Sequence, residues 1–435
     1  MQRVFVQSFG CRASQADGAG IEAAFEDKGL SCVSAVSEAD LVVLNTCTVT
    51  ANADADARQA VRRVRRANPS AKILVTGCFA QRAPEELAAI EGVNWVVGNS
   101  HKTQIADIVL DHLPGVEDYH GQVFAGDISK ATQFISAPVL DAQGDRTRPN
   151  LKVQDGCSNK CSFCIIPSVR GRSRSASLEN VVSQVRQLSQ SYREVVLSGI
   201  NLGRWGRDLP GESRFIHLIE CLLRETELQR LRISSVEPMD WSGELLHLIA
   251  GEPRIARHVH IPLQSGCDSV LKRMFRKYRT RHYASRVDLA RKLMPDAAIG
   301  ADVMTGFPGE TDAEFAESVR FIEQQPFTYL HVFTYSERPG TAAALNPGAV
   351  PISVRRERTR ILREMSDGKN RAFRRGMLGR SLSAVTLNRQ SALTTNFIPV
   401  ELSRARDANE IVDIQIGSLT ESALRERELL PVLPS

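Results

Sequence analysis

Short apolar runs alternate with amphipathic segments along the first hundred residues. The apolar runs, which are typical of β-strands, cover residues 4–10, 41–46, 72–77 and 95–97. The segments between them, which are typical of helices, cover residues 17–28, 54–67 and 84–90. Continuous β-branched strands that alternate with helices predict a parallel sheet with helices on both faces.

The same alternation restarts on a larger scale at residue 151, after a stretch (115–149) that lacks periodicity and that we interpret as a linker. Six further strands are predicted, at residues 151–154, 194–199, 231–235, 258–263, 298–304 and 329–333. Six βα units fall short of the eight that close a TIM barrel. We therefore expect a curved, open (βα)6 partial barrel.

The end of the chain changes character again. Strands are predicted at residues 381–387, 397–400 and 411–416, and they favour a small β-barrel of the OB type. The predicted fold class is α/β with this added barrel. We expect three domains, at residues 1–135, 146–370 and 372–435.

Composition narrows the class of protein. Of 435 residues, 42% are hydrophobic, which is ordinary for a globular chain. There is no apolar run of roughly 18 residues and no signal-peptide pattern, so we expect a cytoplasmic protein without a membrane span. Nine cysteines, an odd number, favour metal binding over disulfides. The net charge of +5 permits a nucleic-acid partner without requiring one.

Three cysteines lie on one short loop after the first strand of the larger repeat. Cys157, Cys161 and Cys164 are separated by three and then two residues, so their sulfurs can turn toward one point. Three thiolates can hold three irons of a [4Fe–4S] cluster and leave the fourth iron open. Zinc would need a fourth ligand, and no second Cys-x-x-Cys or close His pair follows. A buried structural role is the other alternative.

Three more cysteines, Cys11, Cys47 and Cys78, each follow directly on a predicted strand of the first domain. The carboxyl ends of parallel strands share one edge of the sheet, and ligands bind there. The three thiols should therefore converge despite their separation in sequence. They indicate a second three-thiolate cluster, unless three loop cysteines fall at this edge by chance.

The spacing Cys157-x-x-x-Cys161-x-x-Cys164, with Phe163 before the last cysteine, resembles the signature of the radical S-adenosylmethionine (SAM) superfamily. The resemblance implies that SAM chelates the open iron and that an electron from the cluster cleaves it to a 5′-deoxyadenosyl radical. It also implies that SAM is contacted from this loop and from the strand ends. The residues expected there are Phe163, Gly199, Asn201, Ser235, Glu237 and Gln264.

The first domain is similar to the N-terminal domain of the methylthiotransferase family within this superfamily, through residues 8–11, 45–50 and 76–81. The similarity implies that Cys11, Cys47 and Cys78 hold an auxiliary [4Fe–4S] cluster, which carries the sulfur to be inserted. Two SAM molecules would serve, one as methyl donor and one as radical source, and no side chain is named as a catalytic acid or base. We also expect an electron donor such as a flavodoxin or ferredoxin, and a monomer.

Basic residues gather in several runs, one of which directly follows the Cys157–Cys164 loop. A single run is typical of a solvated helix face, but several runs together favour phosphate contacts. The arginines expected to bind nucleic acid are Arg62, Arg63, Arg65, Arg66, Arg170, Arg172 and Arg174. The C-terminal barrel resembles the TRAM domain, which binds tRNA, although its acidic side chains match or outnumber its basic ones.

Residues 45–50 and the arginine-rich segment after them are most similar to one subfamily. That subfamily methylthiolates carbon 2 of N6-threonylcarbamoyladenosine (t6A), next to the tRNA anticodon. Alternatives within the family are isopentenyladenosine in tRNA and an aspartate of a ribosomal protein. From a different class, the chain could be a non-catalytic iron–sulfur protein that binds RNA.

Overall fold

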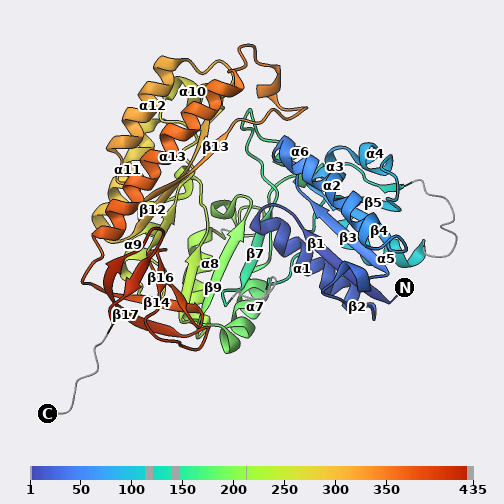
Figure 1. The fold of residues 1–435 in the computed structure, drawn as a ribbon, viewed down its shortest axis with the longest axis horizontal. Coiled ribbons are helices and arrows are strands. Elements are labelled where there is room, and N and C mark those ends of the chain that lie inside the picture. Colours follow the sequence, from blue (N-terminus) through green and yellow to red (C-terminus); the bar gives the residue numbers. More distant parts are fainter. Residues whose placement is uncertain (1, 113–120, 140–146, 212, 429–435) are drawn as a thin grey trace.

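The computed structural model describes residues 2–112, 121–139, 147–211 and 213–428, which form three bodies (Figure 1). The N-terminal domain lies beside the open side of a partial barrel, and a small β-barrel packs at the barrel's far end. The expected domain start at residue 146 and parts of the expected linker, residues 115–120 and 140–146, lie outside the described residues. No described helix combines the length and apolarity needed to cross a membrane.

The N-terminal domain is a six-stranded parallel sheet in the order β2-β1-β3-β4-β5-β6. Its strands are β1 (Arg3–Ser8), β2 (Ser31–Cys32), β3 (Leu41–Thr46), β4 (Lys72–Gly77), β5 (Trp95–Gly98) and β6 (Gln122–Phe124). Its helices are α1 (Arg12–Glu26), α2 (Ala51–Ala67), α3 (Cys78–Arg82), α4 (Pro84–Ala88) and α5 (Ile105–Asp111). The predicted parallel sheet is confirmed. The linker assignment is wrong in part, because β6 joins the sheet beside β5 and is too short to show periodicity.

Successive residues of the central strand β3 enter two different cores. Val42 and Leu44 pack on one face with Val61 of α2. Leu41 and Val43 pack on the other face with residues of α1 and α5. Because both faces are covered, these strands are continuous apolar runs and do not alternate.

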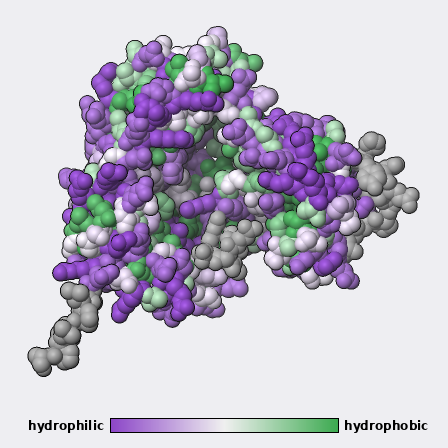
Figure 2. Space-filling model, in the orientation of Figure 1, coloured by the Kyte–Doolittle hydropathy of each residue, from purple (hydrophilic) through white to green (hydrophobic). Residues whose placement is uncertain are grey.

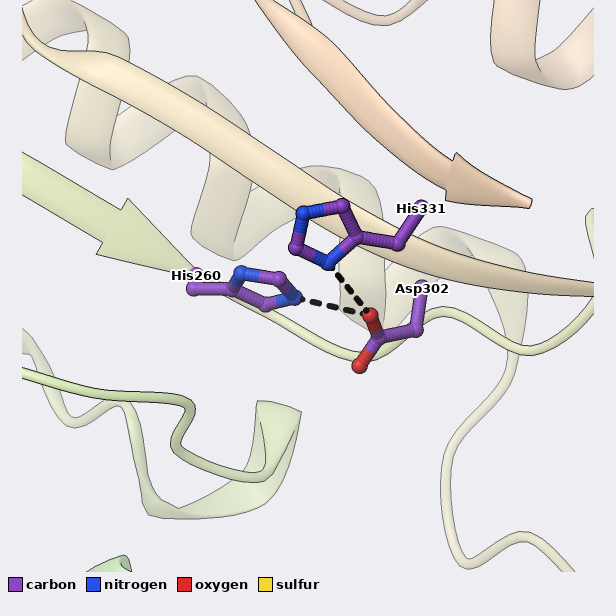
Figure 3. Close-up of side chains that lie close together, drawn as sticks. All are labelled: His260, Asp302 and His331. Atoms are coloured by element: carbon purple, nitrogen blue, oxygen red, sulfur yellow. Dashed lines mark hydrogen bonds and ion pairs between the residues drawn. The ribbon is translucent and has the colours of Figure 1, made fainter. Parts of the chain in front are cut away.

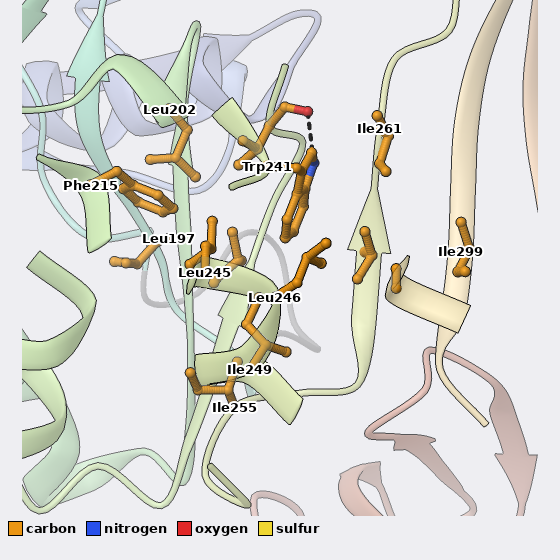
Figure 4. Packing of buried hydrophobic residues seen from close by; sticks show 14 of the residues in the cluster. Leu197, Leu202, Phe215, Trp241, Leu245, Leu246, Ile249, Ile255, Ile261 and Ile299 are labelled. Atoms are coloured by element: carbon orange, nitrogen blue, oxygen red, sulfur yellow. Dashed lines mark hydrogen bonds between the residues drawn. The ribbon is translucent and has the colours of Figure 1, made fainter. Parts of the chain in front are cut away.

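The central domain contains the six predicted strands, but they do not form one continuous ladder. One sheet, in the order β10-β9-β7-β8, joins β7 (Asn150–Asp155), β8 (Arg174–Ser175), β9 (Glu194–Gly199) and β10 (Arg230–Ile233). The other joins β11 (His258–His260), β12 (Ala298–Thr305) and β13 (Tyr329–Thr334). The curved, open barrel is confirmed, with a break between β10 and β11. Trp241 packs near this break and donates from Nε1 to the Val236 carbonyl at 3.0 Å (Figure 4).

Helices cover the outer face of both sheets. They are α7 (Leu178–Ser191), α8 (Phe215–Glu225), α9 (Gly243–Gly251), α10 (Asp268–Arg273), α11 (Thr280–Leu293), α12 (Asp312–Gln324) and α13 (Ile352–Arg375). Helix α6 (Ile166–Arg170) instead packs against Cys78 of α3 in the N-terminal domain. Alternate strand residues such as Leu197, Leu231 and Ile299 pack into one core with them (Figure 4). The residues between these on each strand consequently face the interior of the barrel.

The C-terminal strands close into a five-stranded barrel in the order β14-β15-β16-β18-β17. They are β14 (Ser381–Asn388), β15 (Ser391–Thr394), β16 (Pro399–Glu401), β17 (Ile411–Leu419) and β18 (Leu424–Glu426). The predicted small barrel is confirmed, with β15 and β18 added. It is tied to the partial barrel by Arg232, which donates to the carbonyls of Thr394 and Thr395 at 3.1 and 3.2 Å.

Candidate site at two cysteine triads

Cys157, Cys161 and Cys164, the loop triad, follow β7 at the carboxyl end of the partial barrel. Hydrogen bonds shape the loop: the amide of Cys157 donates to Gly171, and the amide of Cys164 donates to Cys161. The Sγ of Cys157 accepts from the amide of Asn159 at 3.4 Å and from Nδ2 of Asn201 at 3.5 Å. All three thiols are partly buried, so they can hold a group that also reaches the cavity.

Cys11, Cys47 and Cys78, the strand-end triad, come together at the carboxyl edge of the N-terminal sheet. Two glycines make this possible. Gly10 has φ +96°, and a Cβ there would lie 2.7 Å from Cys47 Cβ and 2.9 Å from its Sγ. Gly77 has φ +97°, and a Cβ there would lie 2.3 Å from the Thr46 carbonyl oxygen. Only glycine accepts both the positive φ and this close approach.

The donor sets of both triads fit iron–sulfur clusters. Burial, together with the neighbouring thiols of Cys78 and Cys11, raises the pKa of Cys47 to about 11. Burial, together with the thiols of Cys161 and Cys157, raises the pKa of Cys164 to about 12. Three crowded thiolates are therefore unfavourable by themselves, and positively charged metal is what stabilises them. Iron coordinated by three soft sulfur donors matches this arrangement.

The two triads lie next to each other across the domain boundary. Cys78 packs in one apolar cluster with Ile165, the residue after Cys164, and with Val169. Asn99 binds both sides, because its Nδ2 lies 3.7 Å from Cys78 Sγ and donates to the Val169 carbonyl at 2.7 Å. The strand-end triad and the loop triad therefore meet at this boundary.

Arg170 sits in this boundary and is only 2% exposed. Its Nη1 donates to Asp155 at 2.9 Å, and its Nη2 donates to Asp17 of α1 at 2.9 Å. Burial lowers its pKa, but the charges of Asp155 and Asp17 outweigh this and raise it well above the usual value. The expectation that Arg170 binds RNA phosphate is corrected: its guanidinium is buried and pairs with Asp17 and Asp155 between the two domains.

Arg174 is corrected in the same way, because it is buried and donates to the carbonyls of Gln133 and Arg170 at 2.7 and 2.5 Å. The periodicity of a basic run cannot distinguish an arginine in a domain interface from one in solvent. The other expected nucleic-acid ligands are accessible. Arg62, Arg63, Arg66 and Arg172 are exposed, and Arg65 is partly exposed. Arg62, Arg65 and Arg66 line one surface hollow with Glu91.

Of the residues expected to contact SAM, Asn201 contacts the loop triad and Phe163 lies within its loop. Asn201 binds Cys157, Phe163 packs beside Met304, and Gly199 lies against Gln154. Two buried acceptors, Asn201 Oδ1 and Gln264 Oε1, have no hydrogen-bond partner among the described residues. Buried polar atoms without partners are costly, so these two suit the amino and hydroxyl donors of SAM. Ser235, which follows β10, is partly exposed.

Sequence reasoning missed Arg276 as a residue of the site. It is buried, donates from Nη1 to Cys161 Sγ at 3.1 Å, and pairs through Nη2 with Glu237, an expected SAM ligand. A pocket beside the loop triad is lined by Cys161, Glu237 and Arg276 together. In the sequence Arg276 lies within a basic run, and nothing in that run sets it apart from its neighbours.

Arg338 is a second missed residue. It follows β13, is buried, and donates from Nη1 to the Thr48 carbonyl at 3.0 Å and to Asp54 at 2.7 Å. Thr48 directly follows Cys47, so Arg338 fixes the Cys47 loop against the central domain. No local pattern could have identified it, because its partners lie 284 and 290 residues away in sequence.

Comparisons with known proteins agree with this geometry. The uncharacterized protein family UPF0004 matches residues 3–98, and the radical SAM superfamily matches residues 151–322. A relative from Aquifex aeolicus, "Threonylcarbamoyladenosine tRNA methylthiotransferase MtaB", is 36% identical over 416 residues, covering 95% of this chain and all of the relative. The chain belongs to the radical SAM methylthiotransferase family. A Bacillus subtilis protein of the same name is 39% identical, covering 84% of this chain and 81% of the relative.

Other relatives of this methylthiotransferase carry a different name. A "tRNA-2-methylthio-N(6)-dimethylallyladenosine synthase" from Syntrophus aciditrophicus is 31% identical, covering 84% of this chain and 79% of the relative. Among solved structures, the radical SAM methyltransferase TsrM from Kitasatospora setae has the same fold, with a TM-score of 0.57 at 17% identity. The match covers 79% of this chain and 77% of that one. Membership of the superfamily makes SAM and iron–sulfur clusters the cofactors of this enzyme.

Proposed function

We propose that this methylthiotransferase replaces the hydrogen on carbon 2 of t6A, next to the anticodon of tRNA, by a methylthio group. The observation that carries the proposal is that Cys78 of the strand-end triad packs against Ile165, the residue directly after the loop triad. This chain aligns with most or all of the length of relatives that are named for t6A. We propose Cys157, Cys161 and Cys164 as ligands of one cluster and Cys11, Cys47 and Cys78 as ligands of the other.

The chemistry of the substrate supports two adjacent sites. Carbon 2 of adenine is neither acidic nor a ready electrophile, so acid–base or nucleophilic catalysis has little to act on. Bound SAM and the clusters supply radical chemistry and the sulfur to be inserted. The chain's own residues position these groups. Asn201 and Arg276 donate to sulfurs of the loop triad, and Arg170 and Arg338 hold the strand-end triad against it.

The proposal includes the partners. The exposed arginines of α2 and Arg172 contact the tRNA phosphates, and the closed C-terminal barrel is a second candidate RNA surface of the OB type. Reducing equivalents come from a flavodoxin or ferredoxin. The protein acts as a monomer in the cytoplasm.

Mass spectrometry of tRNA nucleosides tests the proposal. Cells that lack the protein should lose the 2-methylthio derivative of t6A and accumulate t6A. The wild-type gene and a Cys32→Ala variant should restore the product, because Cys32 lies outside both triads and binds the Glu22 carbonyl. A Cys47→Ala variant should not. Loss of 2-methylthio-isopentenyladenosine, with the t6A derivative unchanged, would assign the enzyme to the other nucleoside.

A further inference from the structure

The inner face of β11, β12 and β13 is unusually polar. Val259, Ala301 and Val332 point outward into the core under the helices. The register pairs His260 with Gly300 and Asp302 with His331. These paired residues alternate with the outward-pointing ones, so they lie on the inner face of the sheet. The polar residues on that inner face are His258, His260, Asp302, Tyr329 and His331.

Asp302 lies at the centre of this group, between two imidazoles (Figure 3). Its Oδ1 is 3.1 Å from His260 Nε2 and 3.2 Å from His331 Nδ1. Burial raises the pKa of Asp302, but the adjoining imidazoles outweigh this and hold its pKa well below the usual range. Asp302 is therefore a carboxylate at neutral pH.

Tyr329 and His258 lie next to His260 and hold it in place. The Tyr329 hydroxyl lies 3.1 Å from His260 Nδ1 and 2.7 Å from His258 Nε2. Burial lowers the pKa of His258 well below its usual value, and the charges of Arg232, His260 and Arg12 lower it further. A neutral His258 ring stacks on Phe397 of the C-terminal barrel, with 4.3 Å between ring centroids. This end of the interior is closed.

The opposite end of the group is open. The His331 side chain is 59% exposed and that of Asp302 is 24% exposed, although both lie inside the barrel. His260 is buried, and its two ring nitrogens face Asp302 Oδ1 and the Tyr329 hydroxyl. Phe333, the next residue of β13 on this face, is 38% exposed. Figure 2 shows a hollow between this part of the molecule and the N-terminal domain.

The open end faces the two triads. Met304, the next inner-face residue of β12 after Asp302, packs with Phe163 of the Cys157–Cys164 loop. Arg12 follows Cys11 directly, and its charge lowers the pKa of His258. The polar group thus lies between the closed end and the boundary where the two triads meet.

We infer that His260, Asp302 and His331 form the subsite for the N6 substituent of the substrate base, with Phe333 as a surface on which the adenine stacks. The inference rests on the proposed function and extends it to substrate selection. A threonylcarbamoyl group carries a carboxylate, a hydroxyl and amide N–H groups. The Nε2–H group of His331 donates to its carboxylate, Asp302 accepts from its hydroxyl or N–H, and His260 holds Asp302 in place. Exposed aromatic rings are common stacking surfaces for unpaired bases.

The same geometry disfavours an isopentenyl group. That substituent has no polar atom, so its entry would strip water from Asp302 and the two histidines without replacing their hydrogen bonds. A site built to bind polar substrate groups rejects analogues that lack them far more strongly than an apolar site rejects an added group.

The test uses the reconstituted full-length enzyme and three anticodon stem-loop RNAs, which carry t6A, isopentenyladenosine or unmodified adenosine at the target position. The readout is the ratio of kcat/KM for the t6A RNA to kcat/KM for the adenosine RNA. His331→Ala and Asp302→Asn should each lower this ratio about 10- to 100-fold, mainly through KM, as expected for one lost charge-assisted hydrogen bond. His331→Gln, whose amide nitrogen can reach the position of Nε2, should recover part of it.

His247→Ala is the matched control, because His247 is exposed on the outer helix α9 and bonds only the Gly243 carbonyl among described contacts. It should leave the ratio unchanged. An unchanged ratio in His331→Ala and Asp302→Asn, with kcat/KM lowered equally for both RNAs, would overturn the subsite. If the wild-type enzyme thiolates the isopentenyl RNA and not the t6A RNA, the proposed function itself fails.

Discussion

The two cysteine triads have the same donor set but are built in opposite ways. Cys157, Cys161 and Cys164 lie within eight residues, and hydrogen bonds inside one loop hold them together. Cys11, Cys47 and Cys78 come from three strand ends, and they meet only because the sheet is parallel and because Gly10 and Gly77 allow close approach. The first triad depends on local sequence and the second on the whole domain, so perturbations should separate them.

The largest difference between the two triads should appear when one cysteine ligand is removed from each triad. In reconstituted enzyme, Cys161→Ala should abolish SAM cleavage, whereas Cys47→Ala should retain 5′-deoxyadenosine formation and lose sulfur insertion. Each variant should hold about four irons where the parent holds about eight. Chromatography of 5′-deoxyadenosine and iron analysis provide the measurements. Thiolation by the Cys47→Ala enzyme would reverse the assigned roles of the two triads.

Removal of Arg170 tests how the strand-end triad is held against the loop triad. Arg170→Met should destabilise the fold by about 3–5 kcal/mol, because it leaves Asp17 and Asp155 buried without this partner. Arg172→Met, two residues away at an exposed position, should change stability by less than about 0.5 kcal/mol. Urea unfolding of both variants compares them. Equal midpoints would show that the buried arginine does not join the domains.

A subtler change acts on backbone geometry. Gly10→Ala introduces a side chain at positive φ, and its Cβ would overlap Cys47, whereas Gly29→Ala meets the same positive φ but has nothing within 4 Å. Both should lose about 1 kcal/mol of stability from backbone strain. Only Gly10→Ala should also lose iron from the strand-end triad, as seen by iron analysis. Full iron content in Gly10→Ala would mean that the sheet edge can relax around the added methyl group.

Acid should weaken the ion pairs of Asp17 at the domain boundary. Burial raises the pKa of Asp17, but the charges of Arg170, Lys102 and Lys152 outweigh it and bring the pKa far below the usual value. This stabilisation is complete above about pH 4, the value of an unfolded aspartate, and declines as pH falls below it. The difference in thermal stability between the parent and Asp17→Asn should narrow as the pH falls from about 7 to about 3. A constant difference between them would exclude this titration.

The smallest effect should come from surface charge, which belongs to neither triad. Replacing Arg62, Arg65 and Arg66 together by Gln should weaken tRNA binding and reduce its salt dependence by about one ion per lost phosphate contact. Arg360→Gln is the control, because Glu357 and Glu364 already pair with that exposed arginine. Binding measured at several salt concentrations gives the slope. Identical slopes for both variants would place the RNA elsewhere.

Secondary structure and fold class followed from the sequence because long, strongly patterned elements are locally encoded. Strands β3 and β4 occupy the predicted residues without change. The short strands β6, β15 and β18 did not show a pattern, because three or four residues are too few for a periodicity. The break between β10 and β11 depends on how side chains such as Trp241 pack, and no local signal records that.

The sequence by itself determined the loop triad, the parallel sheet and the convergence of Cys11, Cys47 and Cys78, because spacing and strand order depend on neighbours along the chain. Only the tertiary structure decided which charged side chains are buried and which partners they have. Arg170 is buried between domains while Arg172 is exposed, and Arg276 turns to Cys161. It also gathered His260, Asp302 and His331 from three strands. The energy of a charge depends on burial and on partners far away in sequence, so a local pattern cannot fix it.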